Sequence, residues 1–490
     1  MSDRWNGEER PSGFPLLTVL ALMAGIFAVG SEELVVSPLL VGMAESFDAS
    51  VALMALSVSV YGIATSVGAL IFAPLGDRVS RRLSLTIGMA MFVLGTVLCA
   101  FATSPALLFT GRALAGLATG AFVPTAYAFV GDQIPYGHRA RAMGILVSSW
   151  SLSLVLGVPM GSFVGGWVGW RWTFGLLSIL GALVAVVLVR AGGGQPSAAD
   201  GGTPADDTTP ADGKRPSATD ETPSATETAE APSEHEHGWV RSAARALLAP
   251  GVPVYVAATF LNMLGFYGMY TFLGSALQYR FGTGSSMTGV MILLYGLGFA
   301  TSFLTGRWAD AWGKERVLVA LLAGLVPALV LIPHAARWTP LLVVCLFLWG
   351  SMQSLVVTLL STLLSECSQQ HRGAILAFYS LATNLAVAIG AALFGSLFTE
   401  YGFATLGWVC ASITLVAFGL TGWAYRRRGG GSPHREQPAD TADTTDPTHE
   451  DTTNPTHEDG ADPTHEDSAD PAQGGAVAPA RETKVVAHED

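Results

Sequence analysis

The chain alternates between long apolar runs and short polar connections, and the apolar runs have the length of membrane-spanning helices. A helix needs about 20 apolar residues to cross the hydrocarbon core of a bilayer. These runs should be helical because the core offers no partner for unpaired backbone groups. Six runs precede a long polar segment and six follow it: 15–42, 51–73, 83–102, 105–130, 142–164, 172–190, 252–274, 286–306, 316–335, 338–364, 374–397 and 402–425. The pattern predicts an all-α membrane protein with twelve transmembrane helices.

Two long segments lack this pattern. Residues 191–249 and 426–490 are rich in Ala, Thr, Pro, Asp and Glu, with few large apolar side chains. Such segments cannot bury enough apolar surface to offset the entropy lost on ordering, so both are expected to be disordered. The predicted organisation is an N-terminus, a six-helix bundle, an acidic linker, a second six-helix bundle and an acidic tail: 1–14, 15–190, 191–249, 250–425 and 426–490.

Composition agrees with a membrane protein and excludes other classes. Half of the 490 residues are hydrophobic and 13% are charged, against roughly 25% charged residues in a soluble domain. The net charge of −12 argues against a nucleic-acid partner. The linker and tail together carry −15, so the remainder is slightly basic at +3. The tail repeats Pro-Thr-His-Glu-Asp, which fits either weak metal binding or a solubilising tail. The four cysteines are far apart, and we expect no metal site.

The positions of Lys and Arg predict the orientation in the membrane, because cytoplasmic loops carry an excess of these residues. One set of loops holds Arg78, Arg81, Arg82, Arg139, Arg141, Arg307, Lys314, Arg316 and Arg372. The loops on the other side hold only Arg171, Arg280 and Arg337. Both termini and the linker share the basic side, so we expect them to be cytoplasmic. The excess of Arg over Lys, 23 to 3, is typical of a GC-rich bacterial genome.

An internal repeat relates the two bundles. The loop after the second run contains Asp77 with Arg78, Arg81 and Arg82, and the loop after the eighth run contains Gly306, Asp310, Gly313 and Lys314. The two aspartates are 233 residues apart, and the same offset takes the start of the first run to the start of the seventh. The bundles are therefore expected to be parallel copies, as in many secondary transporters.

These loops resemble the G-x-x-x-D-R-x-G-R-R/K motif of the major facilitator superfamily. The first copy has Ala73 and Ser80 where Gly is usual, and the second has Ala311 in place of Arg. The resemblance covers about residues 15–190 and 250–425 and implies the major facilitator fold. It also implies that these eight loop residues form a cytoplasmic gate between the halves. The alternative is that the arginines only set the topology. No P-loop motif occurs, which argues against ATP hydrolysis.

The fifth run contains closely spaced small residues. Gly157, Gly161 and Gly165 recur every four residues and share one helix face, and Pro159 removes a backbone donor between them. The G-x-P-x-G element, followed by Gly-Trp-Arg-Trp at 169–172, resembles the signature of exporters in this superfamily that work as antiporters. The alternative is an ordinary packing face.

Charged residues inside the runs are candidates for coupling to protons. Arg112 stands within the fourth run, where a charge is costly unless it meets a partner or a water-filled cavity; it can alternatively extend to the membrane surface. Glu32 and Glu33 are adjacent in the first run, and successive helix residues are about 100° apart, so the two should face different surroundings. The stretch from Gly30 resembles G-T-x-E-F-V of drug:proton antiporters, with Glu33 at the acid position. The alternative is that both acids lie at the outer surface.

The second half has no acid well inside a run. Its polar candidates for a substrate cavity are Asn262, Tyr267, Tyr270, Gln353 and Asn384, for which packing between helices is an equal alternative. The resemblance is to the twelve-helix drug:proton antiporters, which include chloramphenicol-resistance and arabinose-efflux-like transporters. It implies a monomer in the cell membrane that exports small amphipathic drugs or metabolites and contacts lipid, substrate and protons.

On this interpretation the proton gradient supplies the energy, and no cofactor or enzymatic activity is expected. Two alternatives remain open: efflux or uptake of a polar solute such as a sugar or nucleoside, and a receptor or scaffold that does not transport.

Overall fold

The computed structural model describes residues 16–134, 136–190, 245–282, 284–301, 311–335, 337–368 and 371–427, without the side chains of 73–78 and 136. All of the described residues belong to one compact unit of the chain, residues 1–433. Several expectations concern residues outside the described ones: the N-terminus, residues 191–244 of the linker, the tail beyond 427, Gly306 and Asp310, and the side chains of Asp77 and Arg78.

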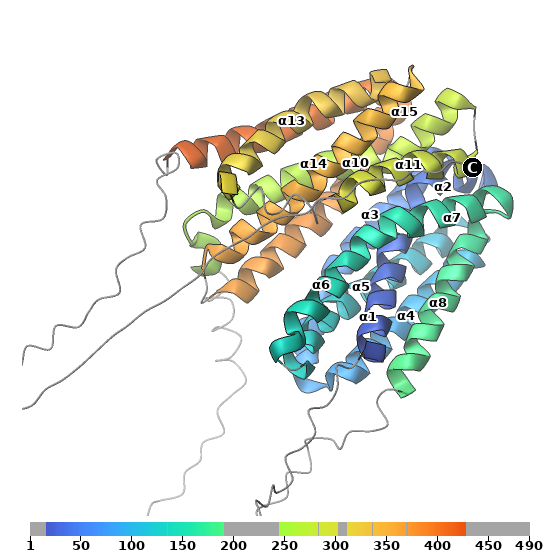
Figure 1. Ribbon diagram of the computed structural model, residues 1–490. Helices are drawn as coiled ribbons and strands as arrows, with labels where there is room; N and C mark the ends of the chain where they lie inside the picture. The colour runs from blue at the N-terminus through green and yellow to red at the C-terminus, as the bar shows by residue number, and fades with distance from the viewer. Residues whose placement is uncertain are drawn as a thin grey trace, which may run out of the picture. The chain divides into compact units, whose positions relative to one another are not determined.

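The first half consists of six spans, and Figure 1 shows how they lie beside one another. The first and fifth are interrupted, the first at Val35 and the fifth by a π-helical segment, η1. In chain order the elements are α1 (Leu16–Leu34) with α2 (Val36–Ser46), α3 (Val51–Arg78), α4 (Arg81–Ala100), α5 (Pro105–Gln133), α6 (Tyr136–Leu152) with η1 (Ser153–Gly157) and α7 (Val158–Trp167), and α8 (Trp170–Arg190).

The second half supplies six more spans. Its elements are α10 (Val252–Phe281), α11 (Ser285–Ala300), α13 (Lys314–Ala335), α14 (Thr339–Glu366) and α15 (Arg372–Arg427). The last element joins two spans across Gly402, which has a φ of 80° that favours glycine. Within the described residues ten helices are long and apolar enough to cross a membrane, and α11 is a shorter apolar helix. With the break in α15, these give twelve spans, and the prediction of an all-α protein with two six-helix halves is confirmed.

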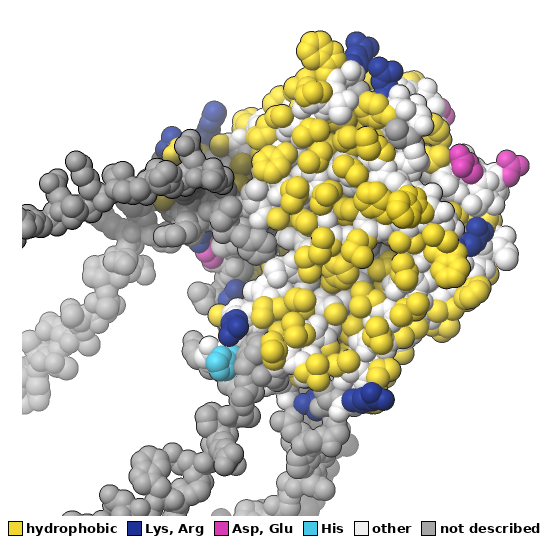
Figure 2. All heavy atoms as spheres, turned by 45° about the vertical axis from the view of Figure 1, so that its right-hand side comes forward, with side chains coloured by type: hydrophobic (Ala, Val, Ile, Leu, Met, Phe, Trp, Pro, Cys, Tyr) yellow, Lys and Arg dark blue, Asp and Glu magenta, His cyan; other side chains and the backbone are white. Residues whose placement is uncertain are grey.

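Apolar side chains cover much of the surface that a bilayer would contact. Figure 2 shows hydrophobic side chains across the visible face and charged ones near its margins. Large aromatic side chains are exposed at span ends, where Trp167 is 83% and Trp312 is 76% exposed. Exposed apolar surface of this extent would be unfavourable in water, and aromatic rings at helix ends are typical of membrane–water interfaces.

Within each half, short connections make successive spans run in opposite directions, so the molecule has two ends. We call the end that carries Arg81, Arg82, Arg139, Lys314 and Arg372 the basic end, and the other the opposite end.

The halves contact each other mainly through α3 with α15, α2 with α10, and α11 with both α7 and η1. Small residues allow two of these approaches. A Cβ atom at Gly274 would overlap the backbone of Ser37, and one at Gly62 would crowd the backbone of Asn384. A large hydrophobic cluster runs from the first half into the second, whereas a smaller cluster lies within the first half alone.

Candidate functional site

The break in the first span sits at the contact between the halves. Pro38 has no backbone N–H, so the carbonyl of Leu34 loses its normal helical partner. The hydroxyl of Tyr270, on α10, donates to this carbonyl at 3.3 Å. Ser37 Oγ in turn donates to the carbonyl of Tyr270 at 2.6 Å, and Gln278 Nε2 donates to the carbonyl of Pro38 at 2.7 Å. The first and seventh spans are thus joined by hydrogen bonds at the position where the first span is interrupted.

Arg112 and Glu32 form an ion pair inside the first half. Both side chains are fully buried, and Arg112 NH1 donates to Glu32 Oε1. The same nitrogen also donates to the backbone carbonyl of Glu32 at 3.2 Å, and Nε donates to the carbonyl of Ser57 at 3.4 Å. The guanidinium lies over the ring of Tyr61, 4.3 Å from its centroid. Arg112 therefore has a buried acid as its partner and does not extend to the membrane surface.

Glu33 faces the second half instead. Tyr267, on α10, donates from its hydroxyl to Glu33 Oε1 at 2.6 Å. Glu33 is 9% exposed, so it is buried in the protein rather than placed at the outer surface. A small cavity of about 10 Å³ adjoins it and is lined by Glu33, Leu34, Ser37, Val58, Tyr267, Tyr270 and Thr271. The two adjacent acids thus have separate partners, one within its own half and one across the interface.

The glycines of the fifth span pack against the first span. A Cβ atom at Gly157 would overlap Ser31, one at Gly161 would overlap Val35, and one at Gly165 would overlap Leu39. The three glycines and the three residues that they meet are both spaced four residues apart, so one face of the fifth span packs along one face of the first span. The π-helical segment η1 ends at Gly157, two residues before Pro159. Proline disrupts the regular helical ladder, and π-bulges are frequent at functional sites. The glycine face therefore positions the segment that carries both glutamates.

Substitution of one of these glycines tests the packing. Gly157→Ala is expected to lower thermal stability and transport markedly, because its Cβ would displace Ser31 from its hydrogen bond to the carbonyl of Phe27; overpacking of this kind costs about 1–3 kcal/mol. Thermal unfolding of the purified protein, with a transport assay, measures both effects. Gly144→Ala is the matched control, since it lies in α6 with no neighbouring atom in reach of a new Cβ. Equal behaviour of the two variants would contradict the proposed role of the glycine face.

The second half brings aromatic rings together beside this contact. Phe266 of α10 lies between Tyr270, Tyr295 and Trp349, with ring centroids 5.4, 6.0 and 5.7 Å away. Asn262 and Gln353 are 2% exposed, one helical turn from Phe266 and Trp349 respectively. Sequence reasoning named these two amides and Tyr270 but missed the other rings, because aromatic residues in apolar runs look like ordinary packing.

Asn384 has a different environment. It lies on α15, where Nδ2 donates to the carbonyl of Ser380 at 2.9 Å and its backbone meets Gly62.

The described part of the predicted gate loops shows two equivalent ion pairs at the basic end. Arg81 Nε lies 3.1 Å from Asp132 Oδ2, and Lys314 pairs with Glu366. Arg81 and Lys314 are 233 residues apart, the offset of the internal repeat. Gly313 precedes Lys314 with a φ of 89°, which explains a glycine at that position. Sequence reasoning assigned no role to the partner acids, although the same offset carries Asp132 to within one residue of Glu366.

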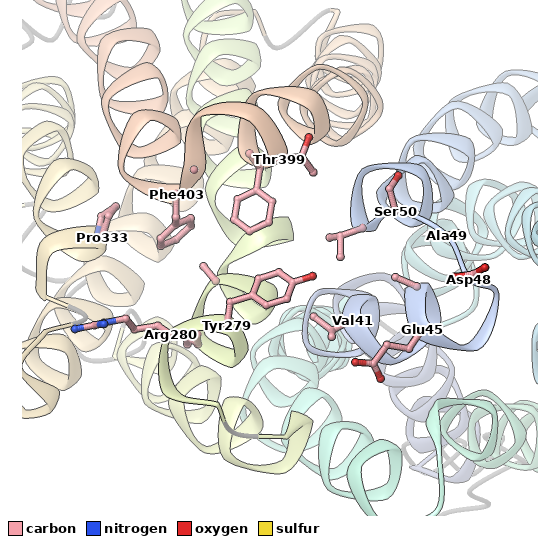
Figure 3. Close-up of a pocket in the computed structure, with 16 residues that line it drawn as sticks. Val41, Glu45, Asp48, Ala49, Ser50, Tyr279, Arg280, Pro333, Thr399 and Phe403 are labelled. Carbon is pink, nitrogen blue, oxygen red and sulfur yellow. The ribbon is translucent and has the colours of Figure 1, made fainter.

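A larger pocket lies at the opposite end, between the two halves (Figure 3). Its volume is about 810 Å³. The wall from the first half includes Glu45 and Asp48, and the wall from the second includes Tyr279, Arg280 and Phe403. The pocket is separate from the buried acids, and none of the predicted coupling, gate, glycine-face or cavity residues lines it.

A family comparison decides the class of protein. The family model described as Major Facilitator Superfamily matches residues 22–273 and 255–458. The chain belongs to the Major Facilitator Superfamily. This transporter is 47% identical over 427 residues to "Uncharacterized MFS-type transporter YwfA" of Bacillus subtilis (strain 168), and the match covers 87% of this chain and 95% of that protein.

Other similar proteins are transporters with named cargo. The chain is 25% identical over 406 residues to a "Probable sugar efflux transporter" of Helicobacter acinonychis (strain Sheeba), covering 82% of this chain and 93% of that protein. The fold resembles that in a crystal structure of a D-xylose-proton symporter, with a TM-score of 0.64 at 15% identity, covering 84% of this chain and 97% of that one.

The transporter is thus a multi-pass membrane protein with bacterial homologues that acts on small molecules, and it is not an enzyme.

Proposed function

We propose that this transporter couples the export of a small amphipathic molecule to the entry of protons. The observation that carries the proposal is the position of Glu33, a buried acid bonded to Tyr267 across the contact between the two halves. In alternating access the halves rock around a central site. A titratable group at their contact changes its surroundings when they move, so its protonation and the movement depend on each other.

The two acids then have different tasks. Glu32 is held by Arg112, whose positive charge favours the ionised carboxylate. Glu33 has a neutral phenol as its described partner, so its proton can be exchanged at a smaller electrostatic cost. Burial favours the neutral form of a carboxylic acid, and exposure to water favours the ionised form. Glu33 is therefore the proposed proton carrier, and Glu32 with Arg112 keeps the first span in position beside it.

The available energy suits this mechanism. One charge that crosses the membrane gains about 2.3 kcal/mol per 100 mV, and a proton gains about 1.36 kcal/mol per pH unit. No cofactor is needed when ion gradients provide the energy, and a monomer contains both halves of the site.

The orientation follows from the charge distribution. The basic end should face the cytoplasm of a bacterial cell, with both termini on that side, because Lys and Arg are retained there. The ion pairs Arg81–Asp132 and Lys314–Glu366 then lie at the cytoplasmic ends of the spans. The predicted gate loops occupy the same region, and the 810 Å³ pocket becomes an outer vestibule. Export is supported by the glycine face on the fifth span, which resembles that of antiporters.

A polar cargo is the second candidate. The relative from Helicobacter acinonychis is named a probable sugar efflux transporter. The buried amides Asn262 and Gln353, each one helical turn along the chain from an aromatic residue of the second half, give this candidate a structural basis.

The experiment is a susceptibility and accumulation screen in a bacterial host that lacks its own efflux pumps. Expression of the chain should lower the accumulation of at least one compound, and a protonophore should abolish the difference. A chain with Glu400→Gln, an exposed acid at the opposite end that does not line the vestibule, serves as the control and should export normally. Export that continues at full rate with the protonophore would contradict proton coupling.

A further inference from the structure

Three helices of the second half form a buried aromatic cluster that the coupling mechanism does not use. Tyr295 of α11 and Trp349 of α14 lie 4.7 Å apart between centroids, and both are fully buried. Phe266 of α10 is 7% exposed and packs on both rings. We call Phe266, Tyr295 and Trp349, with Asn262 and Gln353, the aromatic–amide cluster.

Three hydrogen-bond donors of this cluster have no partner among the described residues. They are Asn262 Nδ2, the hydroxyl of Tyr295 and Gln353 Nε2. Asn262 precedes Phe266 by one helical turn on α10, and Gln353 follows Trp349 by one turn on α14. Since α10 and α14 run in opposite directions, both amides lie on the same side of the ring pair, toward the basic end.

Unpaired donors at this depth are uncommon. Most buried polar side chains in proteins have at least one hydrogen-bond partner, and an unpaired one destabilises the fold. Apolar residues at these positions would avoid that cost. Three such donors around one set of rings therefore indicate a group that supplies acceptors when it binds.

The surroundings of the cluster also indicate the charge of the group that binds there. Among the described residues of the second half, acids and bases lie only at the ends of the spans, including Arg280, Glu366 and Glu400. The buried charges Glu32, Glu33 and Arg112 all belong to the first half. An ammonium-type cation carries no acceptor for these unpaired donors, and an anion would be buried without a counter-charge. An uncharged group with acceptor oxygens satisfies the cluster.

We propose that the aromatic–amide cluster binds an uncharged, oxygen-bearing ring of the cargo, of the kind found in glycosides and nucleosides. One face of the ring would stack on Trp349 or Phe266, and its oxygens would accept from Asn262, Tyr295 and Gln353. This inference rests on the proposed function in that the bound compound is the cargo.

Binding of a ring at the cluster would also change the contact between the halves. Tyr270 is stacked on Phe266 at 5.4 Å and lies 5.8 Å from the ring of Tyr295, and its hydroxyl donates to the carbonyl of Leu34. A ring that enters the cluster must move Tyr270 or its neighbours, and so alters a hydrogen bond that joins the first and seventh spans. Cargo and proton then act on neighbouring residues of α10, Tyr270 and Tyr267.

The test measures binding to the purified full-length chain by equilibrium dialysis, without a proton gradient. The probes are phenyl β-glucoside, uridine and tetraphenylphosphonium. Saturable binding of phenyl β-glucoside or uridine, with no competition by tetraphenylphosphonium, is expected, and the probe that binds identifies the kind of ring. Tyr295→Phe and Gln353→Leu should each weaken this binding by about tenfold. Neither variant should lower the thermal stability of the free protein, since each removes an unpaired donor.

The control variant is Tyr401→Phe, which removes the hydroxyl of an exposed tyrosine at the opposite end and should leave binding unchanged. The proposal fails if neither neutral probe binds, or if tetraphenylphosphonium displaces the bound ring. It also fails if the variants lose stability while affinity stays the same, because the donors would then have only a structural role. Dialysis requires no coupling, so normal binding together with transport that does not depend on a proton gradient would contradict the proposed function and leave this inference intact.

Discussion

Glu33→Gln is expected to abolish proton-driven transport and to leave a folded, membrane-inserted protein. Glutamine has nearly the same shape as glutamate, and its carbonyl oxygen can accept the hydrogen bond that Tyr267 donates at 2.6 Å. The contact between the halves is therefore kept, whereas the proton-binding group is lost. Transport driven by a pH gradient should fall to the background leak, because a site that cannot titrate gains nothing from the gradient.

The measurement uses proteoliposomes with a pH-sensitive dye inside. Addition of cargo should release protons for the natural chain and not for Glu33→Gln. Exchange of labelled for unlabelled cargo, which requires no net proton movement, should continue in the variant and shows that the site still binds. Glu400→Gln, at an exposed acid of the opposite end that does not line the vestibule, should behave as the natural chain does. Full proton-driven transport by Glu33→Gln would remove Glu33 from the mechanism.

Tyr267→Phe distinguishes the role of the proton on Glu33 from the role of the hydrogen bond that Glu33 accepts. This variant keeps the titratable acid but leaves Glu33 without the phenol that binds it across the interface. Coupled transport should persist at a lower rate. The order of the two variants, with Glu33→Gln the more severe, distinguishes a proton carrier from a residue that only holds the halves together.

The sequence predicted the twelve spans because the bilayer imposes a strict demand on each of them. A run of apolar residues of this length must be helical, so its position is readable without tertiary information. Interruptions within a span were harder to predict from the sequence. The first run was expected to be one helix over 15–42, yet it is interrupted at Val35 and continues to Ser46. Pro38 lies one turn beyond the break and leaves the carbonyl of Leu34 without its helical donor. The hydroxyl of Tyr270, from another span, donates to that carbonyl instead.

The site shows the same limit. Sequence reasoning placed Glu32 and Glu33 in different surroundings, because adjacent helix residues are about 100° apart. It could not name the partners, since Arg112 is 80 residues away from Glu32 and Tyr267 is 234 away from Glu33. Pairing at such separations depends on how helices pack. Tyr295 and Trp349 carried no signal at all, because their apolar neighbours are typical of any span.

The second large effect expected is a loss of stability when either partner of the buried ion pair between Arg112 and Glu32 is replaced. Both side chains are fully buried, so removal of one partner leaves an uncompensated charge in a poorly polar interior. Arg112→Met and Glu32→Gln should each reduce the free energy of unfolding by about 3–5 kcal/mol. Arg112→Met should be severe, because it also frees the carbonyl of Ser57 from its bond to Nε.

The double variant tests whether the two residues stabilise the protein by interacting with each other. When both charges are removed, as in Glu32→Gln with Arg112→Met, no unpaired charge remains, and the loss should be smaller than the sum of the two single losses. A coupling energy of about 2 kcal/mol or more is expected for a buried pair of this kind. Denaturant unfolding of the four proteins in detergent measures it, with Arg337→Met as the control for an exposed arginine at the opposite end. Additive losses would show that the two residues act independently, and then Glu32 could no longer be assigned a positioning role while Glu33 carries the proton.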